Sequence, residues 1–380
     1  MQYRVGIIGA GQLARMMAQA AIPLGIEVTL LAASADDGAA RVVRSVIVGS
    51  PDDPDRVREL AARVDVITFD HELVDPGLLD VLEAEGHAVH PRSPVMRLAQ
   101  NKRLQREAVD AAGLPGPAWA AIGSIGDLDA FAATHGWPVV LKAARGGYDG
   151  RGVWKLDARS EAQSVVEGAL GNGTELIVEA FQRLDGEVAV IVARTPGGEC
   201  RVYPATETVQ RDGICHELHI PARFGENVSC EAEMIARDVA EMVGSTGLLA
   251  IEFFVTDGRV LINELAPRPH NSGHWTIEGA ETSQFEQHLR AVLDWPLGDT
   301  AQVAASVVTR NLLGPDGGDP FARIPHALAT DGGHIHWYGK ESRPGRKIGH
   351  ITARASNHAE AERRATAVWQ VLMHGAGEQG

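Results

Sequence analysis

The first hundred residues alternate between short apolar runs, typical of β-strands, and longer stretches with the periodicity of α-helices. Strands that alternate with helices form right-handed βαβ units, in which parallel strands are covered by helices. This alternation predicts an α/β unit built on a parallel sheet. The strands are expected at residues 3–8, 26–31, 46–48 and 66–69, and the clearest helices at residues 12–21, 54–64 and 76–85.

The pattern changes after a helical stretch at residues 96–112, where glycines and prolines gather within residues 113–117. Both residue types interrupt regular structure, so a boundary is placed there. Beyond it strands dominate and helices separate them, which predicts an α+β arrangement. Past residue 298, glycine, proline and short β runs predict a small terminal β unit. Further strands are expected at residues 139–142, 176–179, 187–193, 248–255 and 260–264, and helices at residues 125–135, 231–242 and 284–293.

Composition narrows the classes of partner. The 380 residues suffice for two or three domains. The net charge of -15 repels phosphate backbones and anionic membranes, so neither nucleic-acid nor membrane binding is expected. No apolar run reaches the roughly 18 residues of a membrane span, and no signal-peptide pattern is present. The three cysteines are scattered without a Cys-x-x-Cys pair, which argues against a disulfide framework or zinc site and favours a reducing cytoplasm.

A turn with the spacing Gly-x-Gly-x-x-Ala joins the first strand to the first helix, from Gly9 through Gly11 to Ala14. Small residues there bring backbone amides and the helix N-terminus close to an anion. A dinucleotide site also needs an acid at the end of the second strand, but Asp36 and Asp37 come only in the following loop. The turn is therefore interpreted as phosphate-binding rather than as an NAD site. A tight turn without a ligand is the alternative.

A second glycine-rich segment follows a predicted strand that ends in Lys142. Four glycines lie within residues 146–152, which enclose Tyr148, and Arg145 and Arg151 add positive charge. Glycine permits close approach and positive φ, and the cations suit a polyphosphate. No Gly-Lys-Ser/Thr sequence closes the segment, so it is not a Walker loop. We interpret it as a mobile phosphate lid, with a flexible surface hairpin as the alternative.

Two acids interrupt apolar strands later in the chain. Glu252 lies between apolar residues, and Glu264 is near the end of the next predicted strand. Asp257 and Gly258 between them form a hairpin signal, so the two carboxylates are expected side by side. A carboxylate in an apolar strand is costly unless it is paired or metal-bound, and together with Asn263 these acids suit Mg²⁺ that carries nucleotide phosphates. The alternative is that both acids lie on a solvated face.

Two short segments are dense in polar and basic side chains. Residues 268–274 hold Arg268, His270, Asn271 and Ser272 in a stretch stiffened by proline. This density is unusual for a linker and suits an anionic, hydrogen-bonding substrate. Residues 343–350 form a second basic turn. Taken alone, each could be a solvated loop.

Together these segments resemble the N5-carboxyaminoimidazole ribonucleotide synthases, an ATP-grasp family of purine biosynthesis, nearly from end to end. Residues 263–274 and 343–350 are highly specific in combination, whereas the Gly-x-Gly turn alone is not. The other segments that carry the resemblance are residues 9–13, 68–72, 145–152 and 282–288.

The resemblance implies a Rossmann-like domain over residues 1–100, an ATP-grasp domain over residues 101–296 and a small β-rich C-terminal domain over residues 297–380. It implies ATP- and bicarbonate-dependent carboxylation of 5-aminoimidazole ribonucleotide through carboxyphosphate, with ATP and Mg²⁺ as cofactors. Such phosphoryl transfer depends chiefly on positioning and charge neutralisation. A cytoplasmic homodimer is expected from the resemblance.

The resemblance also implies a role for individual residues. Lys102 and Lys142 are expected at the ATP phosphates, covered by Tyr148, Asp149, Gly150, Arg151 and Gly152; Glu179, Ala180 and Phe181 at adenine; Glu187 at the ribose; Gln210 and Asn263 near the nucleotide; and Glu252 and Glu264 at Mg²⁺. Gln12, Leu13, Glu72, Asn271, Ser272 and Arg346 are expected to bind the ribonucleotide, and Tyr148, Arg268, His270 and Lys347 to act in catalysis. His270 or Glu72 is the candidate for proton transfer.

Three departures from relatives affect single contacts. Leu73 follows Glu72 where relatives often have Asn, Gln210 stands in place of a common histidine, and Lys102 replaces a common arginine. The nearest competing assignment is another ATP-grasp ligase, such as the formate-dependent glycinamide ribonucleotide transformylase. An NAD(P)-dependent oxidoreductase is a second competing assignment, and a non-catalytic protein that has kept the fold is a third.

Overall fold

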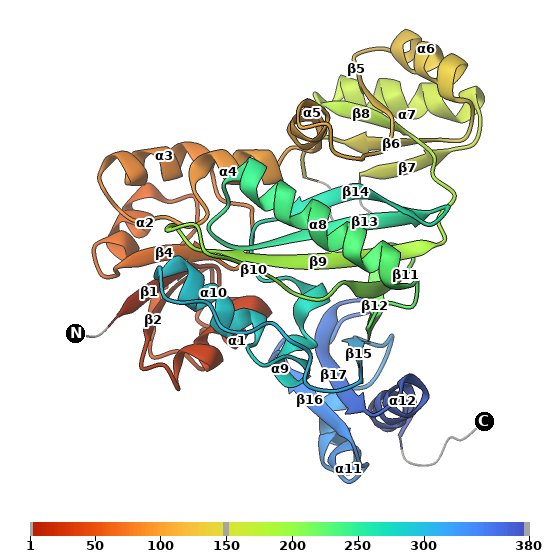
Figure 1. Ribbon diagram of the computed structural model, residues 1–380. Coiled ribbons are helices and arrows are strands. Elements are labelled where there is room, and N and C mark those ends of the chain that lie inside the picture. Colours follow the sequence, from red (N-terminus) through yellow and green to blue (C-terminus); the bar gives the residue numbers. More distant parts are fainter. Residues whose placement is uncertain (1–2, 147–151, 376–380) are drawn as a thin grey trace.

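The computed structural model describes residues 3–146 and 152–375, which form three β-sheets with helices packed against them (Figure 1). The mixed α/β and α+β class expected from the sequence is confirmed. Among the described residues, no helix combines the length and the apolar composition that crossing a membrane requires.

The N-terminal sheet is parallel, as the alternation of strands and helices predicted. Ile7 and Ile8 of its first strand point into opposite layers, which explains why this strand is apolar throughout. Helix α1 (Gln12–Ala21) covers one face, and α2 (Pro54–Ala61) and α3 (Pro76–Ala84) cover the other. The strand order is β3-β2-β1-β4, with β1 (Arg4–Ile8), β2 (Glu27–Ala32), β3 (Ser45–Val48) and β4 (Val66–Phe69).

The helical stretch expected at residues 96–112 is two helices, α4 (Ser93–Ala99) and α5 (Lys102–Ala111). Asn101 separates them, because its backbone is extended and its side-chain oxygen accepts hydrogen bonds from the backbone amides of Arg103 (2.9 Å) and Leu104 (3.2 Å). Such an N-cap satisfies amides that have no partner within the helix. Helical periodicity alone therefore did not reveal the break.

The second sheet is antiparallel and forms a separate lobe with helices α6 and α7, at the upper right of Figure 1. The predicted strands β6 and β8 and helix α6 are present. Strands β5 and β7, of four residues each, are too short to stand out as patterns in the sequence. The order is β5-β8-β6-β7, with β5 (Trp119–Ile122), α6 (Ile125–His135), β6 (Val139–Ala143), β7 (Val153–Leu156), α7 (Arg159–Gly171) and β8 (Leu176–Ala180).

The central sheet has nine strands, most of which belong to the segment that the sequence assigns to the ATP-grasp domain. Asp257 and Gly258 have positive φ and join β13 to β14 as the predicted hairpin. Helix α8 (Glu226–Val243) covers one face, while α9 (Thr276–Gly279) and α10 (Gln284–Val292) lie towards the other face and the N-terminal sheet. The strands before the C-terminal segment are β9 (Gly186–Arg194), β10 (Cys200–Val202), β11 (Thr206–Arg211), β12 (Ile214–Ile220), β13 (Gly247–Thr256) and β14 (Arg259–Ala266), and a 3-10 helix, η1 (Asn271–Gly273), follows.

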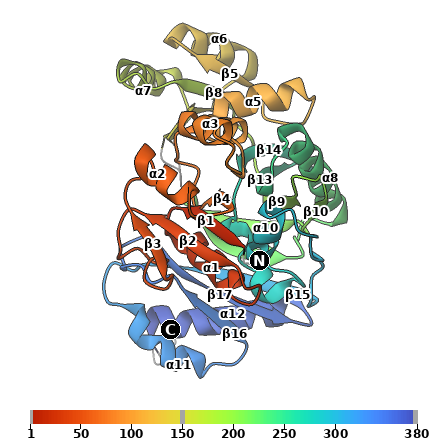
Figure 2. The same ribbon diagram turned by 90° about the vertical axis from the view of Figure 1, so that its left-hand side faces the viewer.

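The C-terminal segment continues the central sheet rather than forming a sheet of its own. Strand β15 pairs with β12, so the order runs β14-β13-β9-β11-β12-β15-β17-β16. The long helix α12 packs against β15 and β17 and was not predicted from the sequence (Figure 2). The elements are β15 (Ser306–Leu313), η2 (Pro320–Arg323), α11 (Ile324–Leu328), β16 (Gly333–Trp337), β17 (Lys347–Ala355) and α12 (His358–His374).

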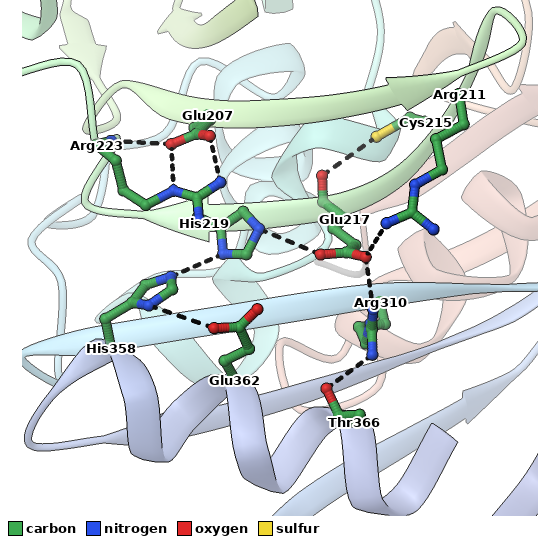
Figure 3. Close-up of polar contacts among 10 residues, drawn as sticks. All are labelled: Glu207, Arg211, Cys215, Glu217, His219, Arg223, Arg310, His358, Glu362 and Thr366. Atoms are coloured by element: carbon green, nitrogen blue, oxygen red, sulfur yellow. Dashed lines mark hydrogen bonds and ion pairs between the residues drawn. The ribbon is translucent and has the colours of Figure 1, made fainter. Parts of the chain in front are cut away.

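Buried polar contacts fasten this segment to the sheet (Figure 3). Glu217 on β12 accepts a hydrogen bond from Arg310 on β15 at 2.5 Å, and Arg310 also donates to Thr366 on α12 at 2.7 Å. Nδ1 of His219 on β12 lies 2.9 Å from Nε2 of His358 at the start of α12. Because Glu217 and His219 are buried, these contacts stabilise one packing of α12.

The N-terminal and central sheets are joined by a buried histidine. The backbone amide of Leu248 on β13 donates to Nδ1 of His288 at 3.1 Å, so Nε2 carries the proton and donates to Thr68 Oγ1 on β4 at 2.7 Å. Burial lowers the pKa of His288 to about 3, which keeps the imidazole neutral. Thr68 and His288 belong to two of the motifs noted in the sequence, and their role is structural.

Asn101→Ala is expected to lower the free energy of unfolding by about 1 kcal/mol, because two amides of α5 lose their acceptor. Urea unfolding followed by circular dichroism measures the loss. Asn357→Ala is the matched control, since Asn357 caps α12 by accepting from Glu360 N at 3.0 Å. Both variants should be destabilised, because each loses a side-chain acceptor at the start of a helix. An Asn101→Ala protein as stable as the unchanged chain would contradict the capping role.

Candidate active site

All three parts of the chain line one cavity of about 1090 Å³. Its walls come from the N-terminal sheet, the antiparallel lobe, the central sheet and the basic turn at residues 343–350. Most of the residues that the sequence analysis assigned to substrate, nucleotide or metal meet there. They are Gln12, Leu13, Glu72, Lys102, Lys142, Glu187, Gln210, Glu252, Asn263, Glu264, Arg268, His270, Asn271, Ser272, Arg346 and Lys347.

Of the other assigned residues, those that the structure describes are not among the cavity-lining positions. Glu179, at 2% exposure, is buried behind the cavity wall, Ala180 follows it, and Phe181 is largely exposed. Gly152 is described but does not line the cavity. The lid residues Tyr148, Asp149, Gly150 and Arg151 lie outside the described residues.

The two strand carboxylates are direct cross-strand neighbours, as the hairpin predicted. Glu252 pairs with Glu264 in the register of β13 and β14, next to a register shift that follows Glu252. The ammonium of Lys102 lies 2.8 Å from Glu264. Burial, followed by the charges of Glu264 and Glu187, raises the pKa of Glu252 to about 7. The site thus brings together carboxylates that repel each other unless a cation lies between them.

This donor set fits Mg²⁺ carrying a nucleotide. Within residues 3–146 and 152–375, no cluster of three or more His, Cys, Asp or Glu side chains could hold a metal by itself. Two adjacent carboxylates with the neighbouring amide of Asn263 are nonetheless the oxygen ligands that Mg²⁺ takes when phosphates complete its shell. Glu187, opposite Phe254 in the pairing of β9 with β13, adds a third acid, and burial raises its pKa to about 7.

Behind these acids lies a buried ionic group of three residues. Glu179 accepts from Arg106 at 2.7 Å and pairs with Lys142 Nζ at 2.7 Å. All three side chains are less than a tenth exposed. Burial raises the pKa of Glu179, but Lys142 and Arg106 outweigh it and the net pKa is lowered. Burial lowers the pKa of Lys142 against the pull of Glu179. The carboxylate of Glu179 is therefore bound to protein cations, and contacts to a base would come from the backbone that follows it.

A second part of the cavity, called its Arg268 end, is built around Arg268. Its guanidinium forms a two-point ion pair with Glu72, from the loop after β4. Burial alone would raise the pKa of Glu72, but the charge and hydrogen bonds of Arg268 lower it to about 2. Both groups therefore stay ionised, and the pair fixes Arg268 in one orientation.

His270 is neutral in this environment. Burial, together with the charges of Arg268 and Lys347, lowers its pKa to about 3. Its Nδ1 lies 2.9 Å from Ser272 Oγ, and its Nε2 lies 3.4 Å from Glu252 Oε1. His270 thus stands between the carboxylate end of the cavity and the Arg268 end.

The glycine turn after β1 holds a carboxylate of the chain itself. Asp70 accepts hydrogen bonds from the backbone amides of Gly11 and Ala14, each at 2.7 Å. These amides are the groups that would bind a phosphate. The structure therefore favours the tight turn without a ligand over the expected phosphate-binding turn, while Gln12 and Leu13 beside it still line the cavity.

Sequence reasoning missed three residues of the site. Lys340 lines the cavity, and its ammonium donates to Gln12 Oε1. Arg106 reads as an ordinary helix residue, and Asp70 was noted only within a motif. A cation one turn after Lys102 on a helix that begins at the site was the one available signal for Arg106.

Known domain families match each of the three parts of the chain. The ribonucleotide synthetase preATP-grasp domain matches residues 1–100, the ATP-grasp domain matches residues 107–285, and the phosphoribosylaminoimidazole carboxylase C-terminal domain matches residues 308–364.

Curated relatives match over almost their whole length. The N5-carboxyaminoimidazole ribonucleotide synthase of Mycobacterium tuberculosis is 44% identical, with 99% of this chain and 89% of the relative covered. That of Corynebacterium ammoniagenes is 39% identical, with 98% and 92% covered. Among solved structures, the synthetase of Thermus thermophilus has a TM-score of 0.88 at 36% identity, with 98% and 99% of the chains covered. The synthase of Aspergillus clavatus in complex with ADP and 5-aminoimidazole ribonucleotide has a TM-score of 0.88 at 30% identity, also with 98% and 99% covered. The chain is thus an ATP-grasp enzyme that belongs to the N5-carboxyaminoimidazole ribonucleotide synthase family.

Proposed function

We propose that the chain catalyses the ATP- and bicarbonate-dependent carboxylation of 5-aminoimidazole ribonucleotide to N5-carboxyaminoimidazole ribonucleotide, as a ligase of purine biosynthesis. The observation that carries the proposal is that one cavity joins two different ends. The first consists of lysines and adjacent carboxylates suited to a metal nucleotide, and the second is the Arg268–Ser272 turn with Arg346 and Lys347. A relative of the same fold has been solved with ADP and this ribonucleotide.

The nucleotide end neutralises phosphate charge. Lys102 and Lys142 provide ammonium groups for the phosphates, and Glu252, Glu264 and Asn263 provide the oxygens that hold Mg²⁺. The metal, when bound, adds positive charge beside the phosphate oxygens. Glu187, Gln210 and the backbone at residues 179–181 are assigned to the ribose and the base, and residues 148–152 to the cover over the phosphates.

At the acceptor end, a bicarbonate oxygen attacks the γ-phosphorus, the bond to ADP breaks, and carboxyphosphate forms. Its breakdown to CO₂ and phosphate beside the exocyclic amine lets the amine nitrogen bond to carbon and lose a proton. Arg268, held by Glu72, and the basic pair Arg346 and Lys347 attract the anionic partners. Gln12, Leu13, Tyr148, Asn271 and Ser272 are assigned to substrate binding.

The proton-transfer roles considered for His270 and Glu72 are revised by their environment. With pKa values of about 3 and about 2, both are weak bases at neutral pH. We therefore assign His270 to hydrogen bonding with the reacting partners and Glu72 to the orientation of Arg268.

Three further properties are proposed, the first from the donor set of the site and the other two on the basis of the family alone. They are Mg²⁺ as the metal, a homodimeric assembly and a cytoplasmic location. Omission and titration of Mg²⁺ in the assay, sedimentation velocity, and cell fractionation test them in turn.

The proposed carboxylating ligase and the formate-dependent transformylase belong to the same superfamily and can be distinguished by their substrates. ADP release is measured with bicarbonate or formate, each with 5-aminoimidazole ribonucleotide or glycinamide ribonucleotide. We expect stimulation only by bicarbonate with the aminoimidazole. Stimulation by formate with glycinamide ribonucleotide would instead identify the transformylase.

An NAD(P) site is disfavoured because Asp70 accepts hydrogen bonds from the amides of Gly11 and Ala14 in the glycine turn. Protection against thermal unfolding by NAD(P) rather than by Mg-ATP would overturn that conclusion.

Glu264→Gln is expected to reduce kcat by about 100-fold or more, because a charged oxygen beside the phosphates is lost. The fold should be preserved, since Glu264 is partly exposed and Gln has the same shape. Glu241→Gln, on the exposed side of α8, is the control and should keep full activity. Near-normal turnover in Glu264→Gln would remove this residue from the metal site.

Lys347→Met is expected to raise KM for the ribonucleotide about 10-fold or more, because an ammonium is lost from the acceptor end of the cavity. Initial rates over a range of ribonucleotide concentrations at saturating Mg-ATP measure the effect. Arg363→Met removes an exposed cation from α12 and serves as the control. Equal kinetic constants in Lys347→Met and Arg363→Met would place Lys347 outside the site.

The raised pKa values predict how stability depends on pH. Because Glu252 and Glu187 have pKa values of about 7 instead of the usual 4.5, the folded protein binds their protons more tightly than the unfolded chain. This contribution stabilises the fold fully below about pH 4.5 and is lost as the pH rises through about 7. The free energy of unfolding of the metal-free protein should therefore fall across this range, as urea titrations at each pH would show.

Glu252→Gln should flatten that fall, because an amide does not ionise in this range. Glu241→Gln should leave the slope unchanged. If Glu252→Gln kept the slope of the unchanged protein, the pKa assigned to Glu252 would be wrong.

A further inference from the structure

Arg106 occupies an unusual position for a helix arginine. It lies on α5 one turn after Lys102 and is only 3% exposed. Its Nη1 donates to Ile262 O and its Nη2 to Asn263 O, each at 2.9 Å. The guanidinium is thus hydrogen-bonded to the backbone of β14 immediately before Glu264. Its Nε donates to Glu179 Oε1 at 2.7 Å.

The same contacts continue to the phosphate-binding lysine. Glu179 Oε2 lies 2.7 Å from Lys142 Nζ, and Lys142 Nζ donates to Asn263 Oδ1 at 3.3 Å. Arg106, Glu179, Lys142 and Asn263 therefore form a closed ring. Its members come from α5, from two strands of the antiparallel lobe and from the central sheet.

Strand β14 is the edge of the central sheet, so one side of its backbone pairs with no strand among residues 3–146 and 152–375. The segment around α5 takes that place. Besides the two bonds from Arg106, the amide of Ile262 donates to Pro115 O at 2.9 Å, and the amide of Leu265 donates to Gln105 Oε1 at 3.2 Å. The strand that carries Asn263 and Glu264 is thus held in place by a helix of a different part of the domain.

We propose that Arg106 is a positioning residue for phosphoryl transfer. Through its single guanidinium, it holds Glu264 and Asn263 of the metal end at a fixed spacing from Lys142 of the phosphate end. The inference rests on the proposed function, because it assigns these groups to Mg-ATP. Arg106 itself is buried and is not among the cavity-lining residues, so it acts through them.

The geometry of the side chain explains why arginine is needed. The planar guanidinium reaches two carbonyls and a carboxylate at once, whereas a lysine ammonium is a single point that cannot span the three acceptors. Arg106→Lys therefore keeps the charge that balances Glu179 but loses some of the hydrogen bonds to the backbone of β14. Displacements of this kind affect the chemical step strongly, since phosphoryl transfer depends on alignment.

The experiment compares Arg106→Lys, Glu179→Gln and their combination with Arg103→Lys. Arg103 is on the same helix, but it is exposed and pairs with Glu107 and Glu175. We expect kcat to fall roughly 10- to 100-fold in both single variants and the half-saturating Mg²⁺ concentration to rise, with the control unchanged. The double variant should lose little more than one single variant, because both substitutions break the same ring.

A residue that only stabilises the fold would lower the melting temperature and leave kcat per folded molecule and Mg²⁺ dependence unchanged. That result, or additive losses in the double variant, would overturn the proposal. Should Arg106→Lys fail to fold, Glu179→Gln carries the test, because it cuts the path between the guanidinium and Lys142.

The test is independent of the acceptor substrate. Affinity for Mg-ADP, measured by calorimetry, should fall in the ring variants and not in Arg103→Lys. If the unchanged protein released no ADP with bicarbonate and aminoimidazole ribonucleotide, the proposed function would fail, while the Mg-ADP measurement would still decide the role of Arg106.

Discussion

Repulsion between neighbouring carboxylates is the constraint around which the site is built. Glu252 and Glu264 face each other across a hairpin whose strands are otherwise largely apolar, and a third acid, Glu187, lies on the next strand. Such a group costs free energy unless cations lie close to it. Lys102 supplies one such cation, because its ammonium lies 2.8 Å from Glu264. Burial and the charges of the neighbouring acids nevertheless raise the pKa of Glu252 to about 7. The acids therefore form a site suited to a metal cation, and their proximity costs free energy when no such cation is bound.

The need for cations explains why distant parts of the chain converge. Arg268 follows β14 directly but is oriented by Glu72 of the N-terminal domain, while Lys347 begins a strand of the C-terminal segment. That segment is continuous with the central sheet through β12 and β15, and buried contacts such as Glu217 with Arg310 fix it there. The acceptor end of the cavity is thus set by the packing of three sequence segments that hold one another in place.

The sequence predicted what depends on neighbours along the chain. Alternating apolar runs indicated the parallel sheet, and Asp257-Gly258 indicated the hairpin that pairs Glu252 with Glu264, because turn chemistry is local. The break at Asn101 was missed because helical periodicity continues across a cap. Helix α12 was missed although Asn357 begins it with a capping side chain. Arg106 was missed because its partners Ile262 and Glu179 are far away in the sequence, which leaves its spacing from Lys102 as the one local signal.

The glycine turn illustrates why a motif alone does not determine chemistry. Its amides point to where a phosphate would lie, and the structure places Asp70 there instead. A carboxylate carried by the chain satisfies the amides of Gly11 and Ala14, so these two groups at the helix N-terminus are not available to a ligand. At this turn the N-terminal domain presents the side chains of Gln12 and Leu13 to the cavity, next to Lys340. Under the proposed function, the Rossmann-like domain thereby contributes to the acceptor end of the cavity, and phosphate binding is assigned to the lysines of the ATP-grasp segment.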